Sequence, residues 1–212
     1  VHLNYQNPTL SPFEEFQRFK THSLVSPFFE GAKRLSYGAR AIASGGPQST
    51  PKVVFPGGAL LGCSAGFLNF ARIKGSHNAI LSGMQAAEAA HKALAEGRAH
   101  DELTSYETGW RRSEIGKDLM PIRNVKPLWS RFGLALGVPL GGLDMLSQQI
   151  FGFSPFGTLK HGKSDAKATQ PLTYNEPMVY AKPDGKLTFD RASSVYLSGT
   201  NHEEDQPVHL RL

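Results

Sequence analysis

The sequence predicts a mixed chain of α/β and α+β character, and one stretch carries most of that prediction. An apolar run at residues 53–61 is typical of a strand buried on both faces. The glycine-rich loop at 62–66 permits a tight turn and a close approach of backbone to a ligand. An alanine-rich helix is expected from Ala79 to about Leu94, with Ser76 as its N-cap. Such a helix start directs unpaired N–H groups at whatever lies before it.

Residues 1–52 contain turn signals and an aromatic stripe. The opening VHLNY is expected to be a strand, and Asn7-Pro8 is expected to form a turn. Ser11 is the expected N-cap of a short helix that follows it. Its phenylalanines at 13, 16 and 19 recur at helical spacing, so they are expected to pack inward.

The segment 121–160 is the second informative region. Asp144 is the only charged residue between Phe132 and Phe153, but Pro139 and several glycines interrupt the apolar run. A membrane-crossing helix is therefore not expected. An amphipathic helix is predicted from about Leu140, either buried in a core or lying in a membrane surface. The residues predicted to face the membrane are Trp129, Phe132, Leu140, Leu143, Leu146, Ile150, Phe151 and Phe153.

The charge distribution favours lipid over nucleic acid. The net charge is +5, and the excess lies mainly in residues 111–167, which hold nine basic and four acidic side chains. Basic residues that flank an apolar segment suit anionic headgroups. The chain contains no aromatic-and-basic recognition motif for nucleic acid.

Several kinds of chemistry are disfavoured. No Ser/His/Asp or Cys/His set has a spacing that suggests hydrolysis, so no catalytic residue is predicted. Residues 202–205 (His-Glu-Glu-Asp) are consecutive and do not predict a metal site. The single cysteine excludes a disulfide or an all-cysteine cluster within the chain. The dinucleotide fingerprint G-x-G-x-x-G is also absent.

The last segment, 165–212, shows short strand signals with a turn at Pro183-Asp184-Gly185. The helix expected at about 100–110 is mostly polar, with a thin apolar face. The opening residues do not resemble a signal peptide, and both ends read as interrupted strands. The chain is therefore expected to be a piece of a longer protein.

Many motifs in order resemble one family. The central stretch reads GCSAGF, then IKGSHNA, then SG and AAE; other matching stretches are NPTLSPFEEFQRFKTH, YGARA, PIRNVKP, TLKHGKSD, KPDGKLTFD and LSGTNHEEDQPVHL. Together they resemble the electron transfer flavoprotein–ubiquinone oxidoreductase family, over essentially the whole chain. The resemblance implies electron passage from reduced electron transfer flavoprotein, through a 4Fe-4S cluster and FAD, to ubiquinone. It also implies a peripheral position on the inner membrane, at the mitochondrial matrix face or the bacterial cytoplasmic face.

The resemblance implies that the helix start contacts FAD. Asn78 would lie beside the N1–C2=O edge of the isoalloxazine, where its amide and neighbouring N–H groups stabilise negative charge. Cys63 replaces the aspartate that is usual in such flavoproteins and is expected to be a small buried filler. His77 is expected to face a neighbouring side chain. The predicted cofactor-binding residues are Gly62, Cys63, Lys74, Gly75, Ser76, His77 and Asn78.

The resemblance also implies a domain organisation. The expected parts are the end of a ubiquinone-binding domain (1–52), a segment of a glutathione-reductase-type FAD-binding domain (53–110), a membrane-associated helical segment (111–165) and the start of a ferredoxin-like iron–sulfur domain (166–212). The cluster ligands are expected outside the chain, so the chain alone is expected to be inactive. Two alternatives stay open: a FixC-type or geranylgeranyl-reductase-like flavoprotein, and a non-catalytic peripheral membrane-binding module.

Overall fold

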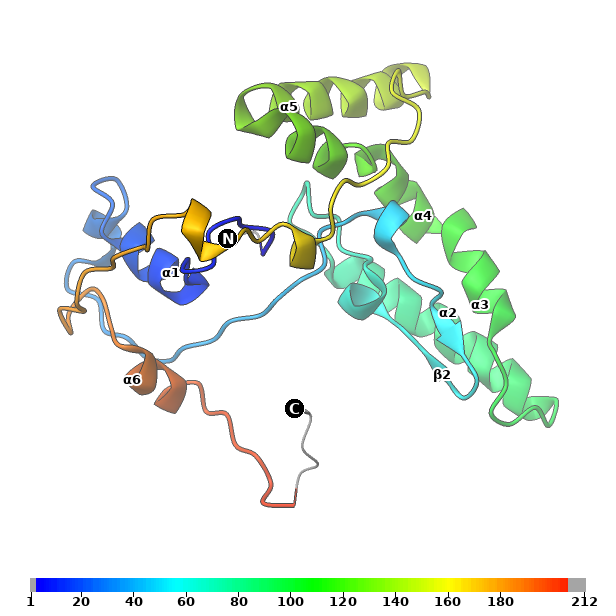
Figure 1. Cartoon of the computed structure of the whole chain (residues 1–212). Helices are drawn as coiled ribbons and strands as arrows, with labels where there is room; N and C mark the ends of the chain where they lie inside the picture. Colours follow the sequence, from blue (N-terminus) through cyan, green and yellow to red (C-terminus); the bar gives the residue numbers. More distant parts are fainter. Residues whose placement is uncertain (1–2, 206–212) are drawn as a thin grey trace. The chain divides into compact units, whose positions relative to one another are not determined.

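The computed structural model describes residues 3–205 and divides into two compact units. Unit 1 joins the ranges 1–40 and 163–212, and unit 2 comprises 41–162 (Figure 1). The described residues are mostly helical and contain one small two-stranded sheet. The chain is therefore mixed, as predicted, with much less strand than the sequence suggested.

Unit 2 contains the sheet and the longest helices. Its elements are η2 (Pro47–Ser49), β1 (Val54–Phe55), β2 (Gly58–Ala59), η3 (Gly62–Ala65), α2 (Ser76–Ala95), α3 (Thr104–Gly109), η4 (Trp110–Arg112), α4 (Glu114–Leu119), η5 (Met120–Ile122) and α5 (Val125–Phe151). The helix predicted from Ala79 to Leu94 is confirmed as α2, which begins three residues earlier. The helix expected at 100–110 is shorter at its start and continues as η4.

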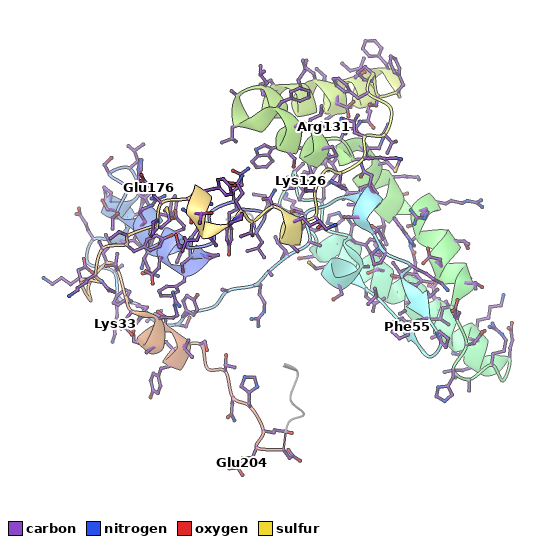
Figure 2. The ribbon with its side chains drawn as sticks, viewed as in Figure 1. Lys33, Phe55, Lys126, Arg131, Glu176 and Glu204 are labelled. Atoms are coloured by element: carbon purple, nitrogen blue, oxygen red, sulfur yellow. The ribbon has the colours of Figure 1, made fainter. Side chains whose placement is uncertain are left out.

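The apolar run at 53–61 is two strands rather than one. Strands β1 and β2 pair antiparallel, with Val54 opposite Ala59 and Phe55 opposite Gly58. Pro56 and Gly57 form the turn between them, and Gly57 has a φ of 77°, the positive value that glycine adopts without strain. The prediction of one strand buried on both faces is wrong because this Pro-Gly turn reverses the chain. Val54 is buried, whereas Phe55 is exposed (Figure 2).

The core of unit 2 lies where α2, α3 and α4 meet β1 and η3. The rings of Phe67 and Trp110 pack with their centroids 4.8 Å apart. Tyr106, one helical turn before Trp110, donates from its hydroxyl to the Leu60 carbonyl at 2.9 Å, and burial raises the pKa of Tyr106 to about 12. The buried core residues are Val53, Val54, Ala65, Phe67, Ala86, Tyr106, Trp110, Ile115, Leu119 and Ile122.

Helix α5 is a hairpin of two limbs. Gly133 has φ 67° and ψ −167°, which breaks the helix, and the two limbs run side by side (Figure 1). A Cβ added at Gly137 would lie 2.6 Å from the Trp129 Cα and 2.8 Å from the Leu128 carbonyl oxygen. Gly141 lies against Val125 in the same way, at 3.5 Å. The Gly-x-x-x-Gly spacing therefore lets the limbs approach at backbone distance.

Unit 1 is built from short helices: α1 (Pro12–Lys20), η1 (Ser26–Phe29), η6 (Asp165–Lys167), η7 (Leu172–Tyr174) and α6 (Arg191–Tyr196). Ser11 caps α1 as predicted, accepting from the Glu14 N–H at 3.4 Å. The strands expected at VHLNY and KLTFD are absent from the described part of the chain, Val1 and His2 lying outside it. The strand-like ending at 207–212 also lies outside the described residues.

Of the predicted aromatic stripe of α1, only Phe13 packs inward, half-buried with its ring centroid 5.8 Å from that of Tyr37. Phe16 and Phe19 are more than half exposed, whereas Gln17 and Lys20 are buried. Helix α1 packs its polar face on the segment near Phe189, whose N–H donates to the Gln17 Oε1 at 3.0 Å. The Lys20 ammonium lies 5.0 Å from the centre of the Phe189 ring. Gln17 and Lys20 are therefore buried because they make a hydrogen bond and a cation–π contact with Phe189.

The turn at 183–185 is confirmed. The Asp184 Oδ1 accepts from the N–H groups of Lys186, Leu187 and Thr188 at 2.8–2.9 Å. The backbone donors, with Thr188 the largest contributor, hold the pKa of the Asp184 carboxyl well below its usual range. The side chain replaces strand pairing in this loop.

Candidate functional site

Helix α2 has 20 residues, and no side chain caps its N-terminus. Gly75 is the N-cap and Ser76 the first helical residue, so the prediction that Ser76 caps the helix is wrong. The Gly75 carbonyl accepts the first helical hydrogen bond from the Ala79 N–H at 2.9 Å. A Cβ at Gly75 would lie 2.9 Å from the Leu68 Cδ1, which explains why a side chain larger than hydrogen would be crowded here. The first-turn N–H groups of Ser76 and His77 therefore have no capping side chain.

The glycine-rich loop packs directly against this helix start. Gly62 has a φ of 52°, and a Cβ there would lie 2.9 Å from the Ala79 Cβ. Its N–H donates to the Ser82 hydroxyl at 3.0 Å. Glycine at 62 thus allows the loop to pack directly against the first two turns of α2. Residues 62–66 and these two turns together form the ledge.

Cys63 is exposed, so the expectation of a buried filler is wrong. The positive φ at Gly62 turns the chain outward, and the Cys63 Sγ accepts from the Ala43 N–H at 3.3 Å. Lys74 is also exposed, but its backbone pairs with Asn69 in both directions, at 3.0 and 3.1 Å. The loop between Asn69 and Lys74 is therefore closed on itself just before the helix begins.

One carboxylate on α4 collects the polar side chains of this region. The Asp118 Oδ2 accepts from the Asn78 Nδ2 at 3.0 Å and lies 3.1 Å from the His77 Nε2. The Asp118 Oδ1 accepts from the Asn69 Nδ2 at 3.0 Å. The Arg72 guanidinium lies 3.6 Å from the same oxygen. Asp118 thus joins α4 to the 66–74 loop and to the first turn of α2.

These contacts set the charge state of Asp118. Burial of the carboxylate opposes its ionisation, but hydrogen bonds from the three neighbouring side chains outweigh that penalty. They hold the pKa of Asp118 below its ordinary value of 3.8. At neutral pH the Asp118 carboxylate is therefore ionised, and its charge lies near both the Arg72 guanidinium and the positive end of the α2 dipole.

Asn78 has one group left for another partner. The residue is fully buried, and its Nδ2 donates to the Phe67 carbonyl as well as to Asp118. Its Oδ1 is buried and has no hydrogen-bond partner among the described residues. Burying an acceptor without a donor costs free energy of folding. The Asn78 Oδ1 is therefore the atom at the helix start that is suited to accept a hydrogen bond from a ligand.

The sequence predicted Gly75, Ser76, His77 and Asn78 as neighbours, and the structure adds three residues that it missed. Asn69, Arg72 and Asp118 complete the cluster. They lie on other segments, and no spacing in the sequence connects Asp118 with Asn78 forty positions away. Asn69 and Arg72 lie within ten residues of Asn78, but no motif in the sequence marks them either.

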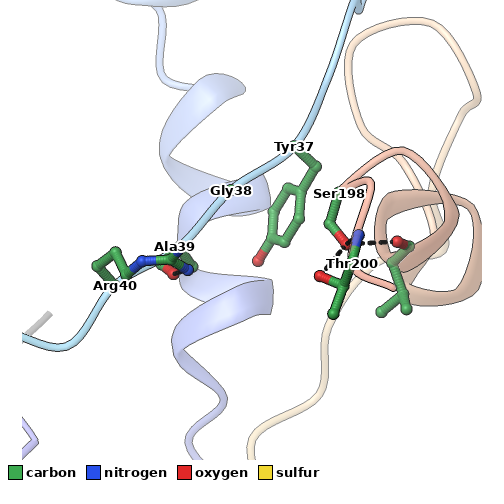
Figure 3. A pocket seen from close by; sticks show the side chains of 7 residues that line it. Tyr37, Gly38, Ala39, Arg40, Ser198 and Thr200 are labelled. Carbon is green, nitrogen blue, oxygen red and sulfur yellow. Dashed lines mark hydrogen bonds between the residues drawn. The ribbon is translucent and has the colours of Figure 1, made fainter. Parts of the chain in front are cut away.

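A hollow in unit 1 lies away from these residues in the chain. It encloses about 590 Å³ and is lined by residues 37–40 and by Val195, Ser198 and Thr200 (Figure 3). Its hydroxyl groups bond one another, with the Ser198 and Thr200 oxygens 2.8 Å apart. None of the residues predicted to bind a cofactor lines it.

The apolar side chains predicted to face a membrane are mostly exposed. The first limb of α5 buries Leu128, whereas the second limb buries Gly137, Gly141 and Asp144 and exposes most of its large apolar residues. Leu140 and Trp129 are half-buried. The exposed members of the predicted set are Phe132, Leu143, Leu146, Ile150, Phe151 and Phe153; Leu134, Leu136 and Val138 extend it.

The helix begins well before Leu140, so the predicted start is wrong. Pro139 and the glycines were read as breaks, whereas only Gly133 breaks the helix. In the second limb, Leu143 and Ile150 are each 61 % exposed. Lys126 and Arg131 lie on the first limb (Figure 2). Within residues 3–205, none of the helices combines the length and the hydropathy that crossing a bilayer requires.

A network of polar side chains closes the base of the hairpin. The buried Asp144, on the second limb, accepts from the Asn124 Nδ2 at 3.1 Å and from the Gln148 Nε2 at 2.8 Å. The Ser154 hydroxyl also donates to Asp144. Asn124 directly precedes the first limb, so the network joins both limbs and the segment that follows them.

Comparison with known proteins gives matches at both ends of the chain. A family model described as "ETF-QO, ubiquinone-binding" matches residues 1–42. A second, described as "Electron transfer flavoprotein-ubiquinone oxidoreductase, 4Fe-4S", matches residues 185–212.

Curated relatives match the whole chain. The chain is 50% identical over 213 residues to the electron transfer flavoprotein-ubiquinone oxidoreductase of Pseudomonas aeruginosa, covering 100% of this chain and 38% of that protein. It is 48% identical to the mitochondrial protein of that name from Oryza sativa subsp. japonica and 49% identical to that from Rattus norvegicus, covering 36% and 35% of them. The chain thus spans little more than a third of the length of these relatives. With matches in order from one end to the other, it belongs to the electron transfer flavoprotein–ubiquinone oxidoreductase family.

Proposed function

We propose that the chain forms part of an enzyme that passes electrons from reduced electron transfer flavoprotein, through a 4Fe-4S cluster and FAD, to ubiquinone. The observation that carries the proposal is the 50% identity to such an oxidoreductase over the full chain. The partners we infer are electron transfer flavoprotein, ubiquinone and a membrane surface. The enzyme class is that of an electron-transferring-flavoprotein dehydrogenase.

We infer four parts along the chain. Residues 1–52 belong to a ubiquinone-binding domain, which is supported by the family match at 1–42. Residues 53–110 belong to an FAD-binding domain of the glutathione-reductase type, and residues 111–165 to a membrane-associated helical segment. Residues 166–212 begin the iron–sulfur domain, which is supported by the match at 185–212.

The helix start at Gly75–Asn78 is where we infer contact with FAD. The orphaned acceptor of Asn78 fits a ligand that brings an N–H or hydroxyl donor, and the uncapped N–H groups of Ser76 and His77 fit its acceptor atoms. When bound, FAD supplies the electron transfer itself. The chain's own residues bind and orient it: Gly62 and Gly75 let Ala79 and Leu68 pack closely at the helix start, and Asn78 offers an acceptor. Because both amide hydrogens of Asn78 are engaged, the predicted donation from its side chain is replaced by acceptance.

The iron–sulfur cluster has no such place in this chain. Four cysteine thiolates are the usual ligands of a 4Fe-4S cluster, and the chain has one cysteine. The described residues also contain no group of three or more side chains arranged to hold a metal ion. We therefore assign no step of cluster chemistry to these residues.

The activity is tested with the purified holoprotein. Reduced electron transfer flavoprotein and a soluble ubiquinone analogue are mixed with it, and quinol formation is followed with the flavin absorbance. Quinol formed only when both are present supports the proposal. Bound flavin without quinol formation would favour another flavoprotein class, and absence of flavin would favour the non-catalytic membrane module. The 212-residue chain alone, tested in parallel, is expected to be inactive.

For α5 we propose a position on the membrane surface, at the matrix face in mitochondria or the cytoplasmic face in bacteria. Its exposed apolar residues and the nearby Arg123 and Arg131 fit an interfacial helix pair. Leu143→Asp and Ile150→Asp are expected to weaken flotation of the protein with anionic liposomes. Val179→Asp is the matched control, because Val179 is 93% exposed and lies in unit 1. Equal flotation of all three variants would contradict the assignment.

A further inference from the structure

We propose that Asp118 is a positioning residue of the flavin site: it fixes the orientation of the Asn78 amide and sets the local charge at the start of α2. The inference rests on the proposed function, because it assigns a role toward the FAD inferred there. It concerns a residue on α4, a helix that no sequence motif connects with the cofactor.

The Asn78 amide is held in one orientation by two acceptors. Its Nδ2 lies 3.0 Å from the Phe67 carbonyl oxygen and 3.0 Å from the Asp118 Oδ2. Both partners are acceptors, so the reversed amide would place its own oxygen against two oxygens. Only one orientation is therefore stable, and it leaves Oδ1 as the group that Asn78 can offer to a ligand.

The charge of Asp118 strengthens the hydrogen bond that fixes the orientation of the Asn78 amide. A carboxylate accepts more strongly than a carbonyl, and it accepts here from Asn78 and Asn69 and lies close to His77. These donors come from two segments, the loop that precedes α2 and the first turn of α2 itself. Loss of the negative charge weakens the bond that holds Nδ2 toward α4 and relaxes the preference for one amide orientation.

The charge of Asp118 also affects the electrostatic potential at the start of α2. The side chain of Asp118 is 16% exposed, so water screens its charge less than that of a surface carboxylate. It stands beside the first turn of α2, whose dipole presents positive charge to the site. A negative charge there opposes the addition of electrons to a nearby cofactor. Its removal is therefore expected to raise the cofactor's midpoint potential.

The chain offers a matched control on the same helix. Glu114 lies one turn before Asp118, and its side chain is 71% exposed and paired with Lys117. Glu114→Gln makes the same change of charge and size as Asp118→Asn, but touches neither Asn78 nor His77. A general effect of net charge or of α4 stability would appear in both variants.

The experiment is a spectroelectrochemical titration of the flavin in the FAD-loaded holoprotein. Asp118→Asn is expected to raise the midpoint potential more than Glu114→Gln does and to weaken FAD retention about tenfold. Asp118→Glu keeps the charge but displaces the carboxylate, so its potential is expected between those of the wild type and Asp118→Asn. After Asn78→Ala, Asp118→Asn is expected to shift the potential less, because the oriented amide is gone.

Each outcome decides something different. Wild-type protein without flavin would overturn the proposed function, and this inference with it. Wild-type protein with flavin, but with the same potential in Asp118→Asn and Glu114→Gln, would overturn this inference alone. If Asp118→Asn does not fold, Asp118→Glu carries the test, and a wild-type potential for that variant overturns the inference.

Discussion

Two aspartates of unit 2 hold the protein together in different ways. Asp118 is partly exposed and lies near the cationic Arg72 and beside His77. Asp144 is fully buried, and its donors, Asn124, Gln148 and Ser154, are neutral. A carboxylate at the surface of a cluster can respond to charge and solvent, whereas a sealed one is committed to its donors. The comparison separates a charge suited to tuning a site from one suited to fixing a shape.

The largest expected effect is the loss of the buried carboxylate. Asp144→Ala removes the buried carboxylate that accepts from Asn124, Gln148 and Ser154, which is expected to cost about 3 kcal/mol of unfolding free energy. Asn124 and Gln148 keep their bonds to the Gly157 and Pro121 carbonyls. Thermal or urea unfolding followed by circular dichroism measures the loss of stability. Asp165→Ala is the control, since Asp165 is exposed in unit 1. Equal losses in both variants would show that the Asp144 network contributes little.

The contact between the limbs of α5 comes next. Gly137→Ala puts a methyl group against the backbone of Leu128 and Trp129, which is expected to destabilise the protein by about 2 kcal/mol. Gly142→Ala is the control on the same limb, because a Cβ there meets nothing within 4 Å. That change is expected to stabilise the helix by up to about 1 kcal/mol. A neutral Gly137→Ala would contradict the close packing of the limbs.

The smallest effect concerns the pH dependence of Asp118. Its pKa is lowered below 3.8 in the folded state, so its ionised form stabilises the fold above that value. This contribution is lost as the pH falls below 3.8 and through the lowered folded-state pKa. The stability difference between wild type and Asp118→Asn is therefore expected to be constant near neutral pH and to shrink in acid. Denaturation at several pH values checks it; a difference that grows in acid would contradict the sign.

Arg72→Gln provides the reference for that series. The Arg72 side chain is 66% exposed and lies 3.6 Å from Asp118, so the pair is expected to contribute less than about 1 kcal/mol. A larger loss would mean that the ion pair, rather than the amide donors, dominates the cluster.

The sequence predicted α2 and the glycine loop well because both depend on local composition. Ala-rich periodicity predicts a helix, and Gly62 marks the close approach that the structure contains. The two strands were read as one because the pattern of apolar residues does not show which way a Pro-Gly turn sends the chain. The glycines of this segment were read as interruptions of the apolar run, although Gly137 and Gly141 are the residues that permit contact between the limbs.

The candidate site could be predicted only in part for a similar reason. Gly75–Asn78 is one continuous segment, so its members were found together. The bonds of Asp118 reach Asn78 and Asn69 across 40 and 49 positions, and no periodicity encodes such a distance. The burial of Gln17 and Lys20 on α1 also depends on a distant segment, which the local pattern of phenylalanines does not reveal.

The break at Gly133 has a consequence for the order of folding. It brings the two limbs of α5 together through contacts of short sequence separation, the bond between Asn124 and Asp144 closing a loop of only 20 positions. Contacts of short sequence separation form faster than contacts of long separation, and the bonds of Asp118 span 40 and 49 positions. We therefore expect the hairpin to form before the contacts of Asp118 when the full chain refolds. The refolding chain would then display the exposed apolar side chains of α5 early, when they are open to self-association.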